Sequence, residues 1–302
     1  MVYLYLLAFA AGFVVLHYST SKIIDSSHEV GSYFNIPSWL VGSLMLAIGT
    51  SLPEAIITIA SMRQNLGIIA FNNLIGSNIT NVCVGLGVAW IMFGINKHNF
   101  DKISIIEMFL IQISLLAIMV LYSLNPVTAS VLFLLFIGFI TSKVIQGNFN
   151  GNGPANNVKK PNLSLLVLAL FFLPLASYVI IYTIEYLADF FGITHAFIGM
   201  ILVALGTSIP EIYSSALALK RDQANIAIGN IVGSNIVNST LVMGLIGFLG
   251  GYQLGLGREL YDLIFMCVVV FLGAIALWLR ISSKLVPLLL IGMYIVFLAS
   301  WF

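Results

Sequence analysis

The chain has 302 residues, of which 60% are hydrophobic and only 8% charged, and its mean hydropathy is +1.08. A soluble domain carries about 25% charged residues, so this composition predicts a protein embedded in a lipid bilayer. The net charge of +1 provides no basic face for nucleic acid, and no long charged or low-complexity tail is present. We therefore expect neither a nucleic acid nor an obligate protein partner.

Ten apolar segments are long enough to cross a bilayer as helices, which takes roughly 20 mostly apolar residues. The first lacks a basic start and a small-residue cleavage site, so we predict a transmembrane helix there rather than a signal peptide. In chain order, the spans are expected at residues 3–25, 37–62, 66–93, 103–122, 126–146, 163–188, 195–219, 223–250, 259–280 and 283–301. The Gly- and Asn-rich stretch 147–162 breaks helix and strand patterns and is predicted to be a linker.

The basic residues predict the orientation of these spans, because cytoplasmic loops are enriched in Lys and Arg. With the N-terminus outside, ten of the twelve fall on the cytoplasmic side, and only Arg63 and Arg258 fall outside. The cytoplasmic ones are Lys22, Lys97, Lys102, Lys143, Lys159, Lys160, Lys220, Arg221, Arg280 and Lys284. Both termini are therefore expected outside, with the linker in the cytoplasm.

The linker separates two predicted five-helix repeats, the first at residues 1–146 and the second at residues 163–302. Each repeat has an odd number of spans, so the second must enter the membrane upside down relative to the first. Inverted repeats with interrupted helices at corresponding positions are typical of secondary transporters, whose substrate site lies at the membrane midplane. The alternative is a duplication that left only a symmetric scaffold.

A short polar motif occurs once in each repeat, inside an apolar span. It is AIGTSLPE at residues 47–54 and ALGTSIPE at residues 204–211, an offset of 157. Pro53 and Pro210 have no N–H and clash with the carbonyl four residues earlier, so both helices should kink or unwind there. The carbonyl at the start of each motif would then become available as a ligand. A kink used only for packing is the alternative.

Glu54 and Glu211, the last residues of these motifs, fall in the middle of their spans. An ionised carboxylate there costs about 2.5–3.5 kcal/mol on insertion scales, and no Lys or Arg lies in the middle third of any predicted span. Each glutamate must therefore be protonated, face water or bind a cation. Two permanently protonated, hydrogen-bonded glutamic acids are the alternative to a cation site.

A second polar motif follows each first one at the same offset. NLIGSNITN at residues 73–81 corresponds to NIVGSNIVN at residues 230–238. In each, an Asn, a Ser and an Asn fall four residues apart and form one stripe along a helix. We interpret the stripes as cation ligands, with hydrogen bonding between helices as the alternative. The off-stripe Asn78 and Asn235 are assigned to that bonding, and the glycine before each Ser should permit close helix contact.

The ligand set consists of carboxylate, amide, hydroxyl and carbonyl oxygens, which favours a hard cation such as Ca²⁺ with its 6–8 oxygen ligands. Softer metals would need His or Cys. The histidines, all expected toward the ends of spans, are His17, His28, His98 and His195. Cys83 and Cys267 fall in apolar segments and are expected to be free and buried.

The paired Gly-Thr-Ser-Leu/Ile-Pro-Glu and Gly-Ser-Asn-Ile motifs resemble the two alpha-repeats of the sodium/calcium exchangers in the calcium/cation antiporter superfamily. The resemblance implies an all-α polytopic fold of ten helices in two inverted repeats, with helices 2, 3, 7 and 8 interrupted. It implies an antiporter of the cell membrane rather than an enzyme, with Ca²⁺ and Na⁺ as transported substrates and no cofactor. Helices 1 and 6 would form a sliding gate over the other eight.

Carried over by position, the resemblance implies one ion-binding cluster drawn from both repeats. Its members would be Ala47, Thr50, Ser51, Glu54, Ser77 and Asn81 from the first repeat and Ala204, Thr207, Ser208, Glu211, Ser234 and Asn238 from the second. Some relatives, including those that also carry K⁺, have Asp where this chain has Asn238. Asn leaves the ionised cluster at −2, which suits one Ca²⁺ and argues against K⁺ cotransport. Three Na⁺ would make it +1, so electrogenic 3:1 exchange is expected.

The main alternative is a proton/calcium antiporter, although relatives of that type typically have Gly-Asn in place of Gly-Thr-Ser before the glutamate. A channel suits inverted, interrupted repeats less well than alternating access does. An intramembrane hydrolase would need a base beside its nucleophile, and no His or Lys is expected at membrane depth. Acid should inhibit transport, because protons compete with Ca²⁺ for the carboxylates.

Overall fold

The computed structural model describes residues 2–34, 37–93, 101–146, 160–190, 206–281 and 283–301. Their regular structure is helical, apart from one isolated antiparallel bridge between Leu124 and Tyr252. Within these described ranges, eight helices are long and apolar enough to cross a membrane, and a shorter apolar helix of 15 residues follows them. The expectation of an all-α polytopic membrane protein is confirmed.

The elements follow the predicted spans closely. In the first half they are α1 (Val2–Phe34), α2 (Ser38–Thr50), α3 (Leu52–Arg63), α4 (Gly67–Thr80), the π-helical η1 (Asn81–Leu86), α5 (Gly87–Phe93), α6 (Lys102–Leu121) and α7 (Pro126–Gln146). In the second half they are α8 (Leu163–Phe190), α10 (Ile209–Lys220), α11 (Ala224–Val237), the π-helical η4 (Asn238–Val242), α12 (Met243–Leu249), α13 (Arg258–Trp278) and α14 (Leu285–Ala299). Most of the predicted linker lies outside the described residues.

The helices are interrupted at equivalent positions in the two halves. The second span breaks at Ser51 (φ −82°, ψ 1°), next to the Pro53 that cannot donate a helical hydrogen bond. Ser208, 157 residues later, has nearly the same backbone angles (φ −87°, ψ −1°) just before α10 begins. The third and eighth spans are each interrupted by a π-helical segment, which begins at Asn81 in one and Asn238 in the other.

The turns after the broken spans repeat as well. Asn65 and Asp222, again 157 residues apart, both adopt left-handed backbone angles, with φ of 59° and 58°. Asn and Asp tolerate this region better than other residues that have a Cβ atom. The internal repeat is thus expressed in backbone conformation as well as in sequence.

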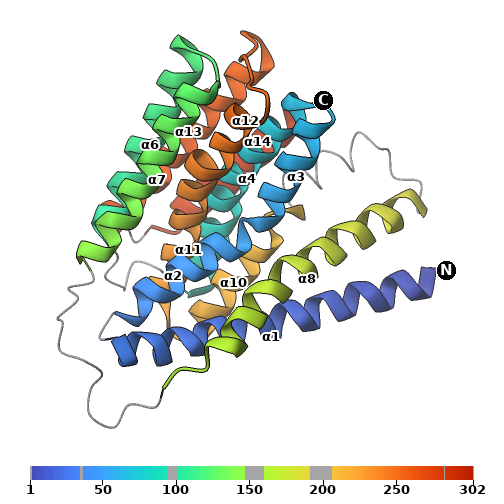
Figure 1. Cartoon of the computed structure of the whole chain (residues 1–302), viewed down its shortest axis with the longest axis vertical. Coiled ribbons are helices and arrows are strands. Elements are labelled where there is room, and N and C mark those ends of the chain that lie inside the picture. Colours follow the sequence, from blue (N-terminus) through green and yellow to red (C-terminus); the bar gives the residue numbers. More distant parts are fainter. Residues whose placement is uncertain are drawn as a thin grey trace.

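Figure 1 shows α1 and α8 lying side by side and running obliquely along one flank of the remaining helices. The broken spans lie inside the bundle, where α11 packs on α2. This contact is close because glycines face it: a Cβ atom on Gly233 would lie 2.7 Å from the Cβ of Ala47. A Cβ atom on Gly229 would likewise collide with the Cβ of Ser43. The predicted role of Gly233 in close helix contact is confirmed.

Three smaller expectations need correction. The first helix ends at Phe34, nine residues later than predicted, because its polar C-terminal part packs against protein; Ser26 and Ser27 are buried there. His17 consequently lies in the middle of α1, where its Nδ1 is 2.8 Å from the hydroxyl of Tyr213. Cys83 is buried as expected, but Cys267 is only half-buried, since one side of α13 faces outward. His98 and His195 lie outside the described residues.

Candidate functional site

The structure buries every described member of the predicted ion-binding cluster, and none is more than 1% exposed. These members are Ala47, Thr50, Ser51, Glu54, Ser77, Asn81, Thr207, Ser208, Glu211, Ser234 and Asn238. Ala204 lies outside the described residues. Buried hydroxyl, amide and carboxylate groups at this density need partners, so their contacts decide what the cluster can do.

Hydroxyl groups at the two helix breaks connect the two halves. Thr50 Oγ1 lies 3.3 Å from Ser234 Oγ and 3.4 Å from Asn230 Oδ1. The equivalent Thr207 Oγ1 lies 2.8 Å from Ser77 Oγ and 3.4 Å from the Oδ1 of Asn73. Each threonine therefore contacts the polar stripe of the other half. The two motifs of both repeats meet in a single centre.

The carbonyl of Ala47 is not left unpaired by the break. It accepts a long hydrogen bond of 3.3 Å from the N–H of Ser51. A carbonyl oxygen has two lone pairs, so one remains for a cation. The expectation that Pro53 makes this carbonyl available holds only in part, because Ser51, the residue at the break, still donates to it.

The two glutamates face each other across this centre. Glu54 lies within electrostatic reach of the hydroxyls of Ser77 and Thr207, and Glu211 within reach of the Thr50 hydroxyl and of Glu54 itself. No carboxylate oxygen of either glutamate accepts a hydrogen bond of ordinary geometry from the residues that the structure describes. Buried carboxylates are stable only when they are paired, protonated or bound to a cation. The two carboxylates therefore need either protons or a cation in this centre.

Other buried oxygens of the cluster are also without partners in the described part of the chain, namely Ser51 Oγ, Asn81 Oδ1 and Asn238 Oδ1. Asn81 uses its amide nitrogen to donate to Asn235 Oδ1 at 3.2 Å, which leaves its oxygen available. The off-stripe asparagines connect helices, as predicted: Asn235 Nδ2 donates to the carbonyl of Asn78 at 3.3 Å.

Three buried residues that contact the cluster or its asparagines were not found from the sequence. Ser215 accepts a hydrogen bond of 3.0 Å from Asn230 Nδ2. Gln112, on α6, and Ser239, in η4, lie 2.7 Å apart beside the off-stripe asparagines. A single Ser or Gln in an apolar span carries little signal by itself. Alignment of the two halves could have revealed the last two, because both counterparts are Val.

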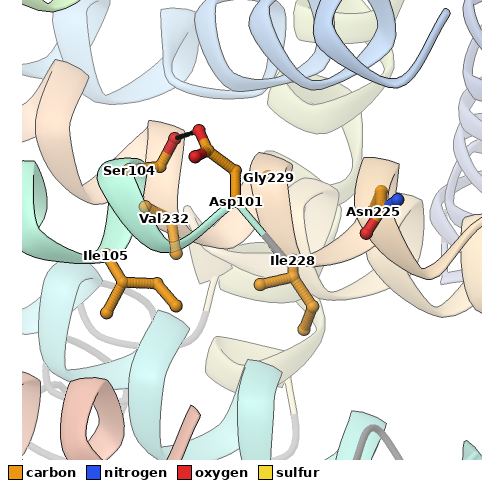
Figure 2. A pocket seen from close by; sticks show the side chains of 7 residues that line it. All are labelled: Asp101, Ser104, Ile105, Asn225, Ile228, Gly229 and Val232. Carbon is orange, nitrogen blue, oxygen red and sulfur yellow. Dashed lines mark hydrogen bonds between the residues drawn. The ribbon is translucent and has the colours of Figure 1, made fainter. Parts of the chain in front are cut away.

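Two cavities lined by described residues lie away from the cluster. One of about 20 Å³, room for about one water molecule, separates the start of α6 from α11 (Figure 2). Its lining residues are Asp101, Ser104, Ile105, Asn225, Ile228, Gly229 and Val232. An open groove of about 630 Å³ lies where α1 passes the start of α8, with Lys22, Glu29 and Lys160 among its lining. No residue of the ion-binding cluster lines either cavity. The candidate site is the cluster itself, because its buried carboxylates accept no hydrogen bond of ordinary geometry from the described residues.

The same arrangement of inverted motifs characterises a known family. Sodium/calcium exchanger proteins match this chain over residues 4–144 and 162–302. The chain belongs to the sodium/calcium exchanger family. Its fold agrees: structures of the sodium-calcium exchanger NCX_Mj superpose over 99% of both chains. The TM-score is 0.83 at 25% identity for crystals soaked with 10 mM Na⁺ and zero Ca²⁺. For crystals soaked with 2.5 mM Na⁺ and 0.1 mM Ca²⁺ it is 0.81 at 26% identity.

Relatives in sequence agree with this family. The chain is 27% identical to the inner membrane protein YrbG of Escherichia coli K12, over 95% of this chain and 94% of that protein. It is 24% identical to the sodium/calcium exchanger MaX1 of Methanosarcina acetivorans, over 78% of this chain and 80% of that one. Family and relatives identify a multi-pass protein of the cell membrane with the antiporter fold predicted from the sequence.

Proposed function

We propose that this protein exchanges Na⁺ for Ca²⁺ by alternating access at the buried cluster. The observation that carries the proposal is the pair of buried carboxylates, Glu54 and Glu211, whose oxygens accept no hydrogen bond of ordinary geometry from the described residues. A cation is the partner that such oxygens need. The surrounding hydroxyl and amide oxygens supply the additional ligands that Ca²⁺ requires.

The charge of the cluster makes the exchange electrogenic. With both glutamates ionised and an amide at Asn238, the empty cluster carries −2, and one Ca²⁺ neutralises it. Three Na⁺ in the same oxygens would leave +1, so the Na⁺-loaded form carries charge across the membrane. The amide at Asn238 also provides no additional negative charge to attract K⁺, and transport is therefore K⁺-independent.

Alternating access in this proposal uses α1 and α8 as the moving pair. They pack along each other on one flank of the bundle (Figure 1). The C-terminal half of α1 is held to α10, which carries Glu211, through Thr20 and Ser214 (3.1 Å) and through the ion pair of Asp25 with Arg221 (2.9 Å). In the predicted orientation these contacts close the cytoplasmic side.

The test is ⁴⁵Ca²⁺ uptake into proteoliposomes that are loaded with Na⁺ and diluted into Na⁺-free medium. Uptake should require internal Na⁺ and should not respond to K⁺ alone. It should rise when valinomycin and an inward K⁺ gradient make the interior positive, because each cycle exports net positive charge. Choline-loaded vesicles and a pH jump are the controls. Uptake driven by the pH jump alone would replace the proposal with proton/calcium antiport, with Glu54 and Glu211 as the proton carriers.

A further inference from the structure

One polar pair beside the cluster breaks the internal repeat. Gln112 on α6 is 1% exposed and Ser239 in η4 is fully buried. Residues at the equivalent positions, 157 away, are Val269 and Val82, and both are fully buried. A buried polar pair is therefore present in one place and replaced by two apolar residues in the other. Since buried polar groups must be satisfied by hydrogen bonds, such a replacement changes the local network.

The pair organises the asparagines beside it. Ser239 Oγ lies 2.7 Å from Gln112 Nε2 and 3.0 Å from Gln112 Oε1. Ser239 Oγ also accepts a hydrogen bond of 2.7 Å from Asn78 Nδ2, and Gln112 Nε2 lies 3.4 Å from the carbonyl of Asn235. Three helices, α4, α6 and α11 with its continuation η4, are thus joined at one point.

The hydrogen bonds of the two cluster asparagines, Asn81 and Asn238, differ as well. Asn81 donates to Asn235 Oδ1, and by the repeat Asn238 should donate to Asn78 Oδ1. That second bond is missing: Asn238 Nδ2, Asn238 Oδ1 and Asn78 Oδ1 are all buried without a partner in the part of the chain that the structure describes. Asn78 is instead turned to Ser239. Ser239, which accepts from Asn78, stands where the other half has Val82.

We propose that Gln112 and Ser239 are positioning residues that make the two ends of the ion cluster inequivalent and thereby set its ion affinity. Their contacts hold Asn78 and Asn235, so that Asn81 presents a fixed amide oxygen. The side-chain amide of Asn238 is left without a partner in the described part of the chain, so its Oδ1 is free to turn toward an ion. This inference rests on the proposed function, because the oxygens concerned are those assigned to Na⁺ and Ca²⁺.

The test replaces each residue by its repeat counterpart in the full chain: Gln112→Val, Ser239→Val and the double variant. Na⁺-driven ⁴⁵Ca²⁺ uptake gives the half-saturating ion concentrations and the maximal rate. Loss of one positioning hydrogen bond is worth about a fivefold change in affinity. We expect the half-saturating concentrations to rise three- to tenfold with Ser239→Val, with a much smaller change in maximal rate. The double variant should show the same half-saturating concentrations as Ser239→Val, since both residues act through Asn78 and Asn235. Ser239→Thr keeps the hydroxyl and should behave like wild type.

A merely structural role predicts a different pattern. Variants would melt at a lower temperature, and their half-saturating concentrations would equal those of wild type; this result would overturn the inference. If a variant does not reconstitute, Ca²⁺-induced thermal stabilisation of the detergent-solubilised protein measures affinity without transport, and Ser239→Ala avoids added bulk. An unchanged Ca²⁺ dependence would again overturn it. A wild-type protein without Na⁺-driven uptake would instead refute the proposed function, whatever the variants do.

Discussion

The two halves of the molecule carry Asn, Ser and Glu at the same positions of the repeated motifs, yet these residues are engaged differently. In the second half, Asn230 Nδ2 donates to Ser215 Oγ at 3.0 Å and to the carbonyl of Glu211 at 3.3 Å. In the first half, the equivalent Asn73 Nδ2 and Thr58 Oγ1 are buried and have no partner within the described residues. A duplicated sequence has therefore not produced a duplicated network.

The serines at the helix breaks differ in the same sense. Ser208 Oγ donates to the carbonyl of Ser77 at 3.5 Å, whereas no described residue pairs with Ser51 Oγ. At the helix breaks, the polar groups of the second half are thus held by hydrogen bonds, while more of those in the first half stay open. We infer that here the second half positions the cluster and the first half adapts to the ion, the reverse of Asn81 and Asn238, where the first-half residue is held.

The largest expected effect tests whether both halves are needed. Glu54→Gln or Glu211→Gln removes one of the two buried charges, and a lost buried charge partner is worth about 3 kcal/mol, or on the order of 100-fold. Na⁺-driven ⁴⁵Ca²⁺ uptake should fall by at least that factor in either variant. Glu29→Gln is the control, because Glu29 is an exposed carboxylate on α1. Wild-type uptake by either cluster variant would show that its half does not bind Ca²⁺ through the glutamate.

The next effect concerns the contact between the halves. Gly233→Ala would place a Cβ 2.7 Å from the Cβ of Ala47, which forces α11 away from α2. Overpacking of this kind costs about 1–3 kcal/mol, so the half-saturating Ca²⁺ concentration should rise about tenfold. Gly138→Ala is the matched control, since nothing lies within 4 Å of its added Cβ. Equal Ca²⁺ dependence of the two variants would mean that this contact does not shape the cluster.

The sequence predicted the parts of this arrangement that depend on local chemistry. Pro53 predicted the break in the second span, and Glu54 and Glu211 indicated the candidate site, because each signal lies within one short segment. The end of α1 was missed because the charges at Lys22 and Asp25 resemble a membrane boundary, whereas tertiary contacts such as the ion pair of Asp25 with Arg221 continue the helix.

The partners of the cluster asparagines could not be predicted, for a different reason. Gln112 and Ser239 lie 127 residues apart and meet only in the folded bundle. The asymmetry between Asn73 and Asn230 is likewise invisible in the sequence, where both residues occupy the same place in the same motif. Which of two identical side chains finds a partner depends on side-chain packing across several helices.

The difference between Asn230 and Asn73 can be tested by its effect on protein stability. Asn230→Ala leaves Ser215 and the Glu211 carbonyl without their donor, and we expect a loss of about 2–3 kcal/mol of stability. Asn73→Ala removes an amide nitrogen that has no partner among the described residues, so its effect on stability should be clearly smaller. Thermal unfolding in detergent, followed by tryptophan fluorescence, measures both. Equal losses would indicate that Asn73 is bonded as firmly as Asn230 and would remove the proposed difference between the halves.

The helix ends far from the cluster show the same divergence. Lys143 on α7, 1% exposed, pairs with Asp101 at 2.7 Å and with Glu107 at 2.9 Å. The equivalents of Asp101 and Lys143 are Arg258 and Ser300, where Arg258 Nη2 donates to Ser300 Oγ at 2.9 Å. The charge is reversed at the equivalent position, and the side chain of Arg258 is 35% exposed.

The difference between the ion pair of Asp101 and the contacts of Arg258 predicts the smallest effect, a change in stability. Burial alone would raise the pKa of Asp101, which lies just before α6, but hydrogen bonds from Lys143 and Ser104 and the charge of Lys143 outweigh burial and lower it. A lowered carboxyl pKa stabilises the folded protein above the unfolded pKa of about 4, and this stability is lost as the pH falls through the lowered value.

Asp101→Asn should therefore lower the free energy of unfolding by about 1.5 kcal/mol at pH 7. This is at the lower end for a charged hydrogen bond because Glu107 still pairs with Lys143. Ser300→Ala should cost less, since Ser300 is exposed and Arg258 keeps its ion pair of 2.9 Å with the buried Asp262. Melting temperatures from pH 7 down to pH 3 measure both, and an Asp101→Asn deficit that stays constant over this range would show that packing, not charge, is its cause.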